Sequence, residues 1–279
     1  MADPLYLDLN GHRTWLKWHR ARRRATDAEF KASRIVEAMR LGASIEVDLV
    51  VHADAGFAIL HDLELERSTT GSGLVRDTTA AALRSLKLRG NDGHPIDEGV
   101  MLLEDLCALL AASPAHPDAL LQLDFKEGLS RLDERAIESF ARAVGPVSTH
   151  MILSGGDSEA VSVLAARTPG SKTGYDPCHR GVLDRLRGPK EFTSFIERAL
   201  EVSPTASMIY LEYALVLAAD AVGVDLIAAV HAAGRRVDAW TIRTVDEESI
   251  SAVRRLIDLK VDQITTDDPE KLHEIWREC

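Results

Sequence analysis

Positive charge, aromatic side chains, cysteine and long apolar runs are all scarce in this sequence of 279 residues. Its 33 lysines and arginines are outnumbered by 44 aspartates and glutamates, which gives a net charge of −11. Such a surface repels polyanions in bulk, so the sequence predicts no nucleic-acid partner. A substrate that carries a phosphate would need a local basic patch.

No apolar run approaches the roughly 18 residues that a membrane-spanning helix requires, so we expect no membrane insertion. The N-terminal residues Met1 to Tyr6 lack the basic and apolar regions of a signal peptide. Three cysteines, Cys107, Cys178 and Cys279, lack the spacing of metal ligands. Reduced thiols in the cytoplasm are the simplest expectation. The sequence leaves open whether the chain forms a homo-oligomer.

Short apolar segments alternate with helical patterns along the whole chain. One such helix carries Ile35, Val36 and Met39 as an apolar stripe and ends at Gly42, and the last opens with Asp268-Pro269. We count eight principal strands, at residues 14–20, 45–51, 120–126, 150–154, 172–176, 208–212, 236–242 and 262–267. This alternation predicts the α/β class and a (β/α)8 TIM barrel. No linker divides residues 1–279, so we expect a single domain.

Two carboxylates lie on one face of the second strand. Period two places Glu46 and Asp48 on the same side, while Ile45 and Val47 point the other way. Adjacent acids repel each other, so a cation between them is needed if both are to stay ionised. The alternative is an exposed edge strand with two solvated acids. A short apolar run follows and ends at His61, which lies 15 residues after Glu46.

Polar and aromatic residues recur at the carboxyl ends of the predicted strands, which is where a barrel of this kind carries its active site. These residues are His19, Arg20, Glu46, Asp48, Asp124, Lys126, Tyr175, Glu212, Trp240 and Asp267.

Three of the acids form a candidate metal site. Glu46, Asp48 and Asp124 would supply an oxygen-rich shell, which suits Mg²⁺ or Ca²⁺, with Mn²⁺ as an alternative, rather than Zn²⁺. His19 and His61 are candidates for an acid–base pair. Arg20 and Lys126 supply positive charge for a substrate anion. A metal, two histidines and two cations together indicate phosphodiester cleavage.

Other readings stand beside these. Arg22, Arg23 and Arg24 are either part of a basic patch or a solvated loop. Trp240 is either core or a platform for an apolar part of a substrate, and we place it with Glu212 and Tyr175 among the substrate-binding candidates. The remaining histidines we interpret as structural or surface residues: His12, His52, His94, His116, His150, His179, His231 and His273.

Six separated motifs resemble the glycerophosphodiester phosphodiesterase family over residues 14–272. They are His19-Arg20 with Glu29, Glu46-x-Asp48, His61-Asp62, Asp124-x-Lys126, Trp240-Thr241 and Thr266-Asp267-x-Pro269. The resemblance implies a TIM barrel whose small insertion after the second strand corresponds to part of residues 62–120. It also implies a divalent metal on the acids at 46, 48 and 124, acid–base roles for His19 and His61, and phosphate binding by Arg20 and Lys126.

The sequence departs from the family pattern at four places. Ala21 stands where the family usually has glycine, Glu29-Phe30-Lys31 replaces Glu-Asn-Thr, and Asp124 replaces a glutamate. Three arginines crowd the loop after the first strand. These departures retain every catalytic group but alter the pocket walls. A sugar phosphodiester, such as an agrocinopine-type opine, is therefore considered beside glycerophosphodiesters.

The sequence thus predicts metal-dependent hydrolysis of a small phosphodiester to a phosphomonoester and an alcohol. The nucleophile is either water or a neighbouring substrate hydroxyl, and the roles of the two histidines stay open. Phospholipase D-like cleavage of lipid head groups is one alternative. A non-catalytic barrel that binds a phosphorylated ligand is another.

Overall fold

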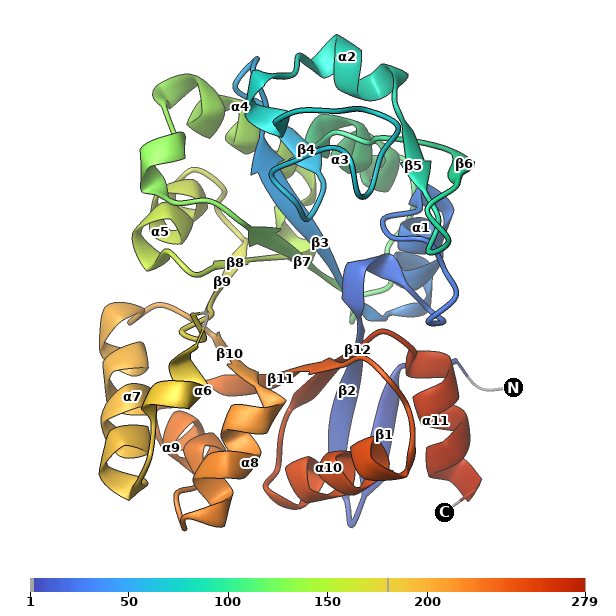
Figure 1. Cartoon of the computed structure of the whole chain (residues 1–279). Coiled ribbons are helices and arrows are strands. Elements are labelled where there is room, and N and C mark those ends of the chain that lie inside the picture. Colours follow the sequence, from blue (N-terminus) through green and yellow to red (C-terminus); the bar gives the residue numbers. More distant parts are fainter. Residues whose placement is uncertain (1–2, 180, 279) are drawn as a thin grey trace. The chain divides into compact units, whose positions relative to one another are not determined.

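The computed structural model describes residues 3–179 and 181–278 and contains two compact units (Figure 1). The first unit consists of Met1–His19, Arg23–Ala25 and Thr173–Cys279, and the second of Arg20–Arg22 and Thr26–Lys172. Cys279, whose thiol we expected to be reduced, lies outside the described residues. Each unit is described by itself below.

The sheet of the second unit is built around β3 (Ser44–Val51). This strand pairs in parallel with β7 (Leu120–Phe125), which pairs in parallel with β8 (Met151–Gly155). The short strand β4 (Phe57–Ile59) runs antiparallel on the other side of β3. Every residue of β3 is buried and both of its edges are paired, so the alternative of an exposed edge strand is wrong.

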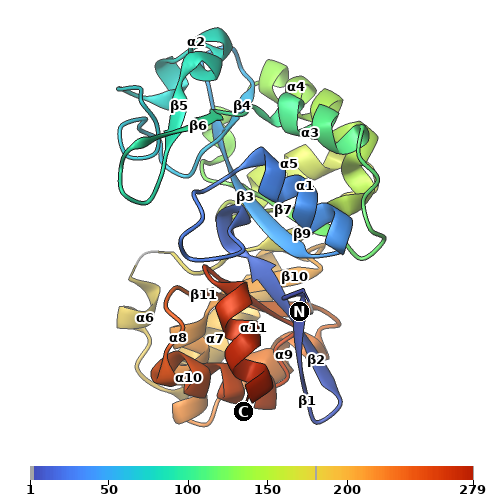
Figure 2. The ribbon, with the colours of Figure 1, turned by 90° about the vertical axis from the view of Figure 1, so that its right-hand side faces the viewer.

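Four principal helices accompany these strands. They are α1 (Ala32–Leu41), α3 (Leu103–Ala111), α4 (Glu134–Val144) and α5 (Ser158–Ala166). The expected stop at Gly42 is confirmed, since this residue adopts a φ of 87°, which only glycine reaches without a steric penalty. α3 and α4 lie side by side (Figure 2). Phe57 of β4 contacts Phe140 of α4 and Phe125 of β7 in edge-to-face geometry, which joins this helix layer to the sheet.

Between β4 and α3 the chain forms the insertion. It contains the 3-10 helix η2 (Val75–Asp77), α2 (Ala80–Ser85), and the antiparallel strands β5 (Lys87–Arg89) and β6 (Pro95–Gly99). Its apolar side chains form a small core of their own with residues of β3 and β4: Val50, Ala58, Leu60, Leu65, Val75, Leu83, Leu88, Val100 and Leu102. The sequence predicts no helix or strand for most of this region, because its buried residues are too widely spaced for a clear period.

The first unit contains a sheet in the order β1-β2-β12-β11-β10-β9. The parallel strands are β2 (His12–Trp18), β12 (Gln263–Thr266), β11 (Arg236–Ile242), β10 (Met208–Glu212) and β9 (Lys172–Tyr175). β1 (Tyr6–Leu9) pairs antiparallel with β2 and was not predicted. Together the two units supply eight parallel strands that alternate with helices, as the sequence predicts.

The described part of the first unit has six helices: α6 (Val182–Arg185), α7 (Pro189–Val202), α8 (Tyr213–Ala221), α9 (Leu226–Ala232), α10 (Glu247–Asp258) and α11 (Pro269–Glu278). The predicted alternation of strands and helices implies one helix between β10 and β11, but the chain forms the pair α8 and α9 there. Gly223, with a φ of 80°, ends the first, and the Asp225 side chain caps the second by accepting a hydrogen bond from the Ala228 N–H.

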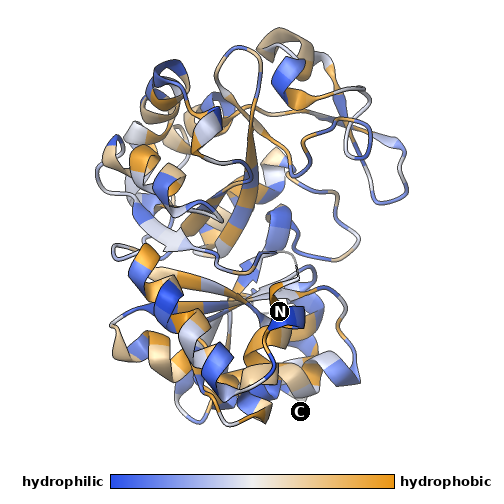
Figure 3. Ribbon diagram, turned by 60° about the vertical axis from the view of Figure 1, so that its left-hand side comes forward, coloured by the Kyte–Doolittle hydropathy of each residue, from blue (hydrophilic) through white to orange (hydrophobic). Residues whose placement is uncertain are grey.

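Apolar residues gather on the strands and on one face of most helices (Figure 3). In the described part of the chain, no single helix has the length and apolar composition to cross a membrane. The pair α8 and α9 passes that test together, although it is bent by 102°. Both helices bury leucine and valine side chains in the core of the first unit.

Candidate active site

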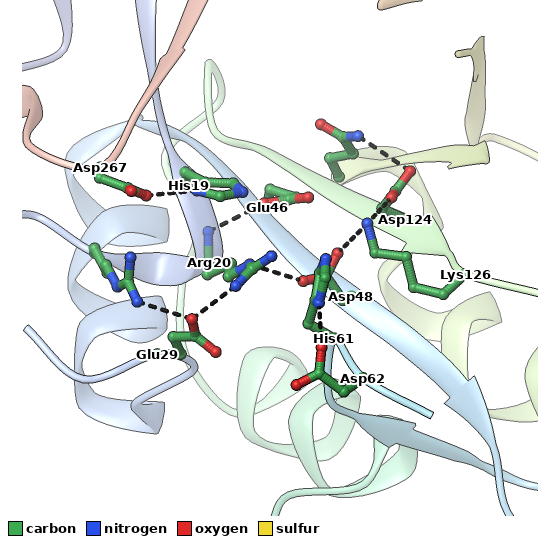
Figure 4. Close-up of polar contacts among 12 residues, drawn as sticks. His19, Arg20, Glu29, Glu46, Asp48, His61, Asp62, Asp124, Lys126 and Asp267 are labelled. Carbon is green, nitrogen blue, oxygen red and sulfur yellow. Dashed lines mark hydrogen bonds and ion pairs between the residues drawn. The ribbon is translucent and has the colours of Figure 1, made fainter. Parts of the chain in front are cut away.

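Three carboxylates converge at the carboxyl half of the second unit's sheet. Glu46 and Asp48 lie two residues apart on β3, and the parallel register places Asp48 beside Asp124 of β7. Ligand oxygens of these three acids all lie within 4.8 Å of one another (Figure 4). The predicted alternation along one strand and the parallel pairing of the next are what bring them together.

Asp48 is fully buried, and neither of its oxygens accepts a hydrogen bond from the described residues. Its neighbours are cations: Lys126 Nζ lies 2.7 Å from Oδ1, and Arg20 Nε lies 3.3 Å from Oδ2. Burial, and next the charge of Glu46, raise the pKa of Asp48 well above its usual range. The two cations therefore offset only part of the cost of burying this carboxylate beside Glu46.

Asp124 is held from several sides. Its Oδ1 accepts a hydrogen bond from the Ser154 hydroxyl at 2.5 Å, and Gln122 Nε2 in turn lies 2.8 Å from the same hydroxyl. Its Oδ2 lies 2.5 Å from Lys126 Nζ. Burial alone would lower the pKa of Lys126, but Asp124 and Asp48 raise it well above its usual value, so the ammonium stays charged. The shorter acid at position 124 is therefore fixed in place by its neighbours.

The three acids fit a divalent cation. All donors are oxygens, two of the three residues are buried, and the orphaned oxygens of Asp48 leave lone pairs for a ligand. The ammonium of Lys126 bridges Asp48 and Asp124, so it balances part of their charge. Glu46, Asp48 and Asp124 are the residues that would hold the metal.

Arg20 lies in a strained turn directly after the first strand. It adopts a φ of 51° and is followed by Ala21 at 59°, both in the left-handed region that side chains avoid at a cost of about 1 kcal/mol or more. Glycine would adopt this conformation without that penalty, and Ala21 is one of the positions where the sequence departs from the family pattern that it resembles. The turn directs the Arg20 N–H to Glu46 Oε2 at 3.1 Å and its Nη1 to Glu29 Oε1 at 2.7 Å.

The neighbouring arginines are paired with acids. Arg22 Nη2 donates to Glu29 Oε1 at 2.8 Å in the second unit. In the first unit, Arg23 and Arg24 both donate to Glu270. In these pairs the Arg22 and Arg23 side chains are 13% and 19% exposed, whereas Arg24 is 60% exposed.

His61 follows β4, and its Nδ1 lies 2.7 Å from Asp62 Oδ1. Because a carboxylate only accepts, this bond places the proton on Nδ1 and leaves the Nε2 lone pair available. Burial, and next the charge of Arg20, lower the pKa of His61. The imidazole is therefore neutral near pH 7 and suited to accept a proton.

His19, the residue before Arg20, has an equivalent arrangement in the first unit. Its Nδ1 lies 2.5 Å from Oδ1 of Asp267, which follows β12. β2 and β12 pair in register up to Trp18 and Thr266, so the residues after each strand meet. In both candidate histidines, the Nδ1 ring nitrogen therefore contacts an aspartate carboxylate.

The three substrate-binding candidates of the first unit line two different cavities. Glu212 and Trp240 line one of about 740 Å³, together with residues from Arg243 to Arg255. The indole N–H of Trp240 is buried without a hydrogen-bond partner among the described residues. Tyr175 lines a second cavity of about 490 Å³ with His179 and Arg198. The sequence had grouped all three residues in one site.

Sequence reasoning missed several supporting residues. Ser154 is the last residue of its predicted strand and Gln122 lies two residues before Asp124 on the same face, so strand periodicity offered a signal for both. Arg67 contacts both Asp62 and Glu29 from the insertion, and nothing in the local pattern indicated this. The other two cysteines, Cys107 and Cys178, are free thiols, and burial raises the pKa of Cys107 to about 12.

Comparison with known proteins supports the resemblance to the glycerophosphodiester phosphodiesterase family. Residues 34–135 match the model of the glycerophosphoryl diester phosphodiesterase family. This segment carries the three acids, His61 and Lys126. Among curated proteins, none matches the sequence.

Solved structures share the fold. A phosphodiesterase from Oleispira antarctica, in complex with the product sn-glycerol-3-phosphate, is 19% identical, with a TM-score of 0.66 over 95% of this chain and 96% of its own. A glycerophosphodiester phosphodiesterase from Parabacteroides distasonis is 19% identical, with a TM-score of 0.65 over 96% and 98%. One from Thermotoga maritima is 17% identical, with a TM-score of 0.64 over 95% and 99%.

These likenesses confirm two predictions. The chain has the α/β (β/α)8 TIM-barrel fold. It resembles the glycerophosphodiester phosphodiesterases, which are phosphoric diester hydrolases, in both family match and fold.

Proposed function

We propose that this chain is a metal-dependent phosphodiesterase that hydrolyses a small glycerophosphodiester to a phosphomonoester and an alcohol. The observation that carries the proposal is the buried cluster of Glu46, Asp48 and Asp124 with two cations and His61 around it. The bound product named for the Oleispira structure, sn-glycerol-3-phosphate, supports glycerophosphodiesters as the substrate class.

Arg20 and Lys126 orient the substrate's phosphate, since both carry positive charge next to the acids. Their donors offset the negative charge that the phosphoryl oxygens gain in the transition state. A divalent ion on the three acids would supply Lewis-acid polarisation of those oxygens. The arrangement thus provides positive charge in a site that is otherwise acidic.

His61 takes a proton on Nε2 from the attacking hydroxyl while its Nδ1–H stays on Asp62. The family resemblance implies His19 as the second member of the pair; its Nδ1 lies beside Asp267 in the first unit, and as an imidazolium it would give its Nε2 proton to the departing alkoxide. Attack breaks the bond between phosphorus and the alcohol oxygen and forms one bond from phosphorus to the new oxygen. Water as nucleophile gives the phosphomonoester directly, whereas a substrate hydroxyl gives a cyclic phosphate first.

The test is turnover on a panel of glycerophosphodiesters and sugar phosphodiesters, each with Mg²⁺, Ca²⁺ or Mn²⁺. We expect EDTA to abolish hydrolysis and the metal to restore it. Full activity in a metal-free preparation would contradict the role of the acids. If a sugar phosphodiester were hydrolysed faster than every glycerophosphodiester, we would conclude that the substrate is an opine-like sugar phosphodiester.

The histidine roles have their own test. His61→Ala and His19→Ala should each lower kcat by at least about 100-fold, the usual contribution of general acid–base catalysis. His94→Ala, which changes an exposed histidine of the insertion, is the matched control and should keep wild-type turnover. Near-wild-type turnover of both site variants would exclude the acid–base pair.

A further inference from the structure

The insertion contributes one side chain to the candidate site. Arg67 lies in the loop that opens the insertion, six residues after His61. The backbone there is fixed: Leu65 and Thr69 are buried, and the Thr69 hydroxyl donates to the Leu65 carbonyl at 2.7 Å. The Arg89 N–H donates to the Ser68 carbonyl at 2.8 Å. A half-exposed arginine therefore projects from a rigid loop.

The guanidinium of Arg67 connects two carboxylates that serve different functional groups. Its Nε donates to Asp62 Oδ2, and its Nη2 lies 3.4 Å from Glu29 Oε2. Asp62 holds His61 through its other oxygen, at 2.7 Å. Glu29 holds Arg20 through its other oxygen, also at 2.7 Å. One planar cation thus links the carboxylate partners of a candidate base and of a candidate phosphate ligand.

We propose that Arg67 is a positioning residue that orders His61 through Asp62 and Arg20 through Glu29. This inference rests on the proposed function. Arg67 fixes the Asp62 carboxylate so that Oδ1 faces the His61 ring. That contact selects the tautomer with the proton on Nδ1 and directs Nε2 toward the reacting phosphate. Planar, two-sided recognition of this kind suits arginine and not lysine.

A plain surface ion pair would behave differently. The Arg67 side chain is 52% exposed, and exposed pairs typically contribute only about 0–1 kcal/mol to stability. If Arg67 did nothing more, its removal would leave kcat and the state of His61 unchanged. Arg84 provides the comparison, because it is an exposed arginine of the same insertion. Its partners, Glu104 and Asp105, are not among the candidate site residues.

The experiment is a double-mutant cycle measured on a glycerophosphodiester. Arg67→Ala should lower kcat about 10- to 100-fold, as loss of an outer ligand typically does, with a smaller change in KM. In a His61→Ala background the same change should cost clearly less than in wild type, because only the route through Glu29 and Arg20 remains. Arg84→Ala should match wild type in both backgrounds.

A second measurement does not depend on turnover. In protein labelled with ¹⁵N-histidine, NMR should show His61 with its proton on Nδ1, and Arg67→Ala should shift the ring toward a mixture of tautomers. Arg67→Lys, which keeps the charge, should show the same shift and replaces the alanine variant if that variant does not fold.

The outcomes separate the two proposals. Equal losses of kcat from Arg67→Ala with and without His61, or an unchanged His61 tautomer, would overturn the ordering of His61 by Arg67, and an unchanged kcat in Arg67→Ala would overturn both of its roles. A wild-type protein that cleaves no phosphodiester would defeat the proposed function instead, and the NMR result would still decide whether Arg67 orders His61.

Discussion

Two fully buried aspartates, one in each unit, have opposite environments. Asp238 of β11 accepts hydrogen bonds from Thr265 at 2.6 Å and from Gln263, and it lies 3.2 Å from Lys17 Nζ. Asp48 of β3 accepts no hydrogen bond from the described residues and has cations at ion-pair distance only. The first carboxylate thus has two hydrogen-bond donors and one cation, whereas the second is balanced by two cations alone.

This difference distinguishes an aspartate that stabilises the fold from one that serves binding and catalysis. A buried charge that is fully paired and hydrogen-bonded belongs to the folding free energy of its unit. A buried charge left under-satisfied costs stability and is retained where a ligand completes it. We therefore assign Asp238 and Lys17 to stability, and Asp48 with Glu46 and Asp124 to binding and catalysis.

The largest expected effect is on turnover. Asp48→Asn removes the charge at the centre of the acid cluster, and we expect kcat/KM to fall about 1,000-fold, which corresponds to about 4 kcal/mol. The melting temperature without metal should change little, because Lys126 keeps Asp124 as a partner and Arg20 keeps Glu29 once the buried carboxylate is neutralised. Kinetics and thermal unfolding on the same preparation check this. A variant that loses stability but keeps turnover would reverse the assignment.

Asp238→Asn should show the opposite pattern. It leaves the Lys17 ammonium, which is 2% exposed, beside a neutral amide. Breaking a buried pair in this way typically costs about 3–5 kcal/mol. Urea unfolding should show that loss, while turnover per folded molecule stays near wild type. The double variant Lys17→Met/Asp238→Leu should recover part of the stability, and failure to recover any would argue against a paired-charge origin.

The smallest effect concerns His52, a buried histidine just after β3 that we interpret as structural. Burial lowers its pKa, so the folded protein keeps the neutral ring while the unfolded chain takes up a proton. Its contribution to stability is therefore present above the unfolded pKa of about 6.5 and is lost as the pH falls below it. Urea unfolding of wild type and His52→Gln between pH 8 and 5 should show a shallower decline in the variant. Parallel curves would exclude His52 as the source.

The sequence predicted those features that depend on strand periodicity. Alternation placed Glu46 with Asp48, and parallel strand order brought Asp124 to them. The sequence did not predict the contacts made by loops, because the partners of Arg67 and His19 depend on how distant segments pack. The core of the insertion and the division into α8 and α9 were missed for the same reason, since short elements carry too few residues to show a period. The single domain over residues 1–279, the cytoplasmic location and any homo-oligomer stay predictions.

The central claim is that the acid cluster of the second unit, and not the buried pair of the first, binds a divalent metal. Calorimetric titration of the metal-free protein with Mn²⁺ tests it most directly, on wild type, Asp48→Asn and Asp238→Asn. We predict one bound ion per chain for wild type and for Asp238→Asn, and none for Asp48→Asn. Binding by Asp48→Asn as tight as that of wild type, or no binding by wild type, would contradict the account.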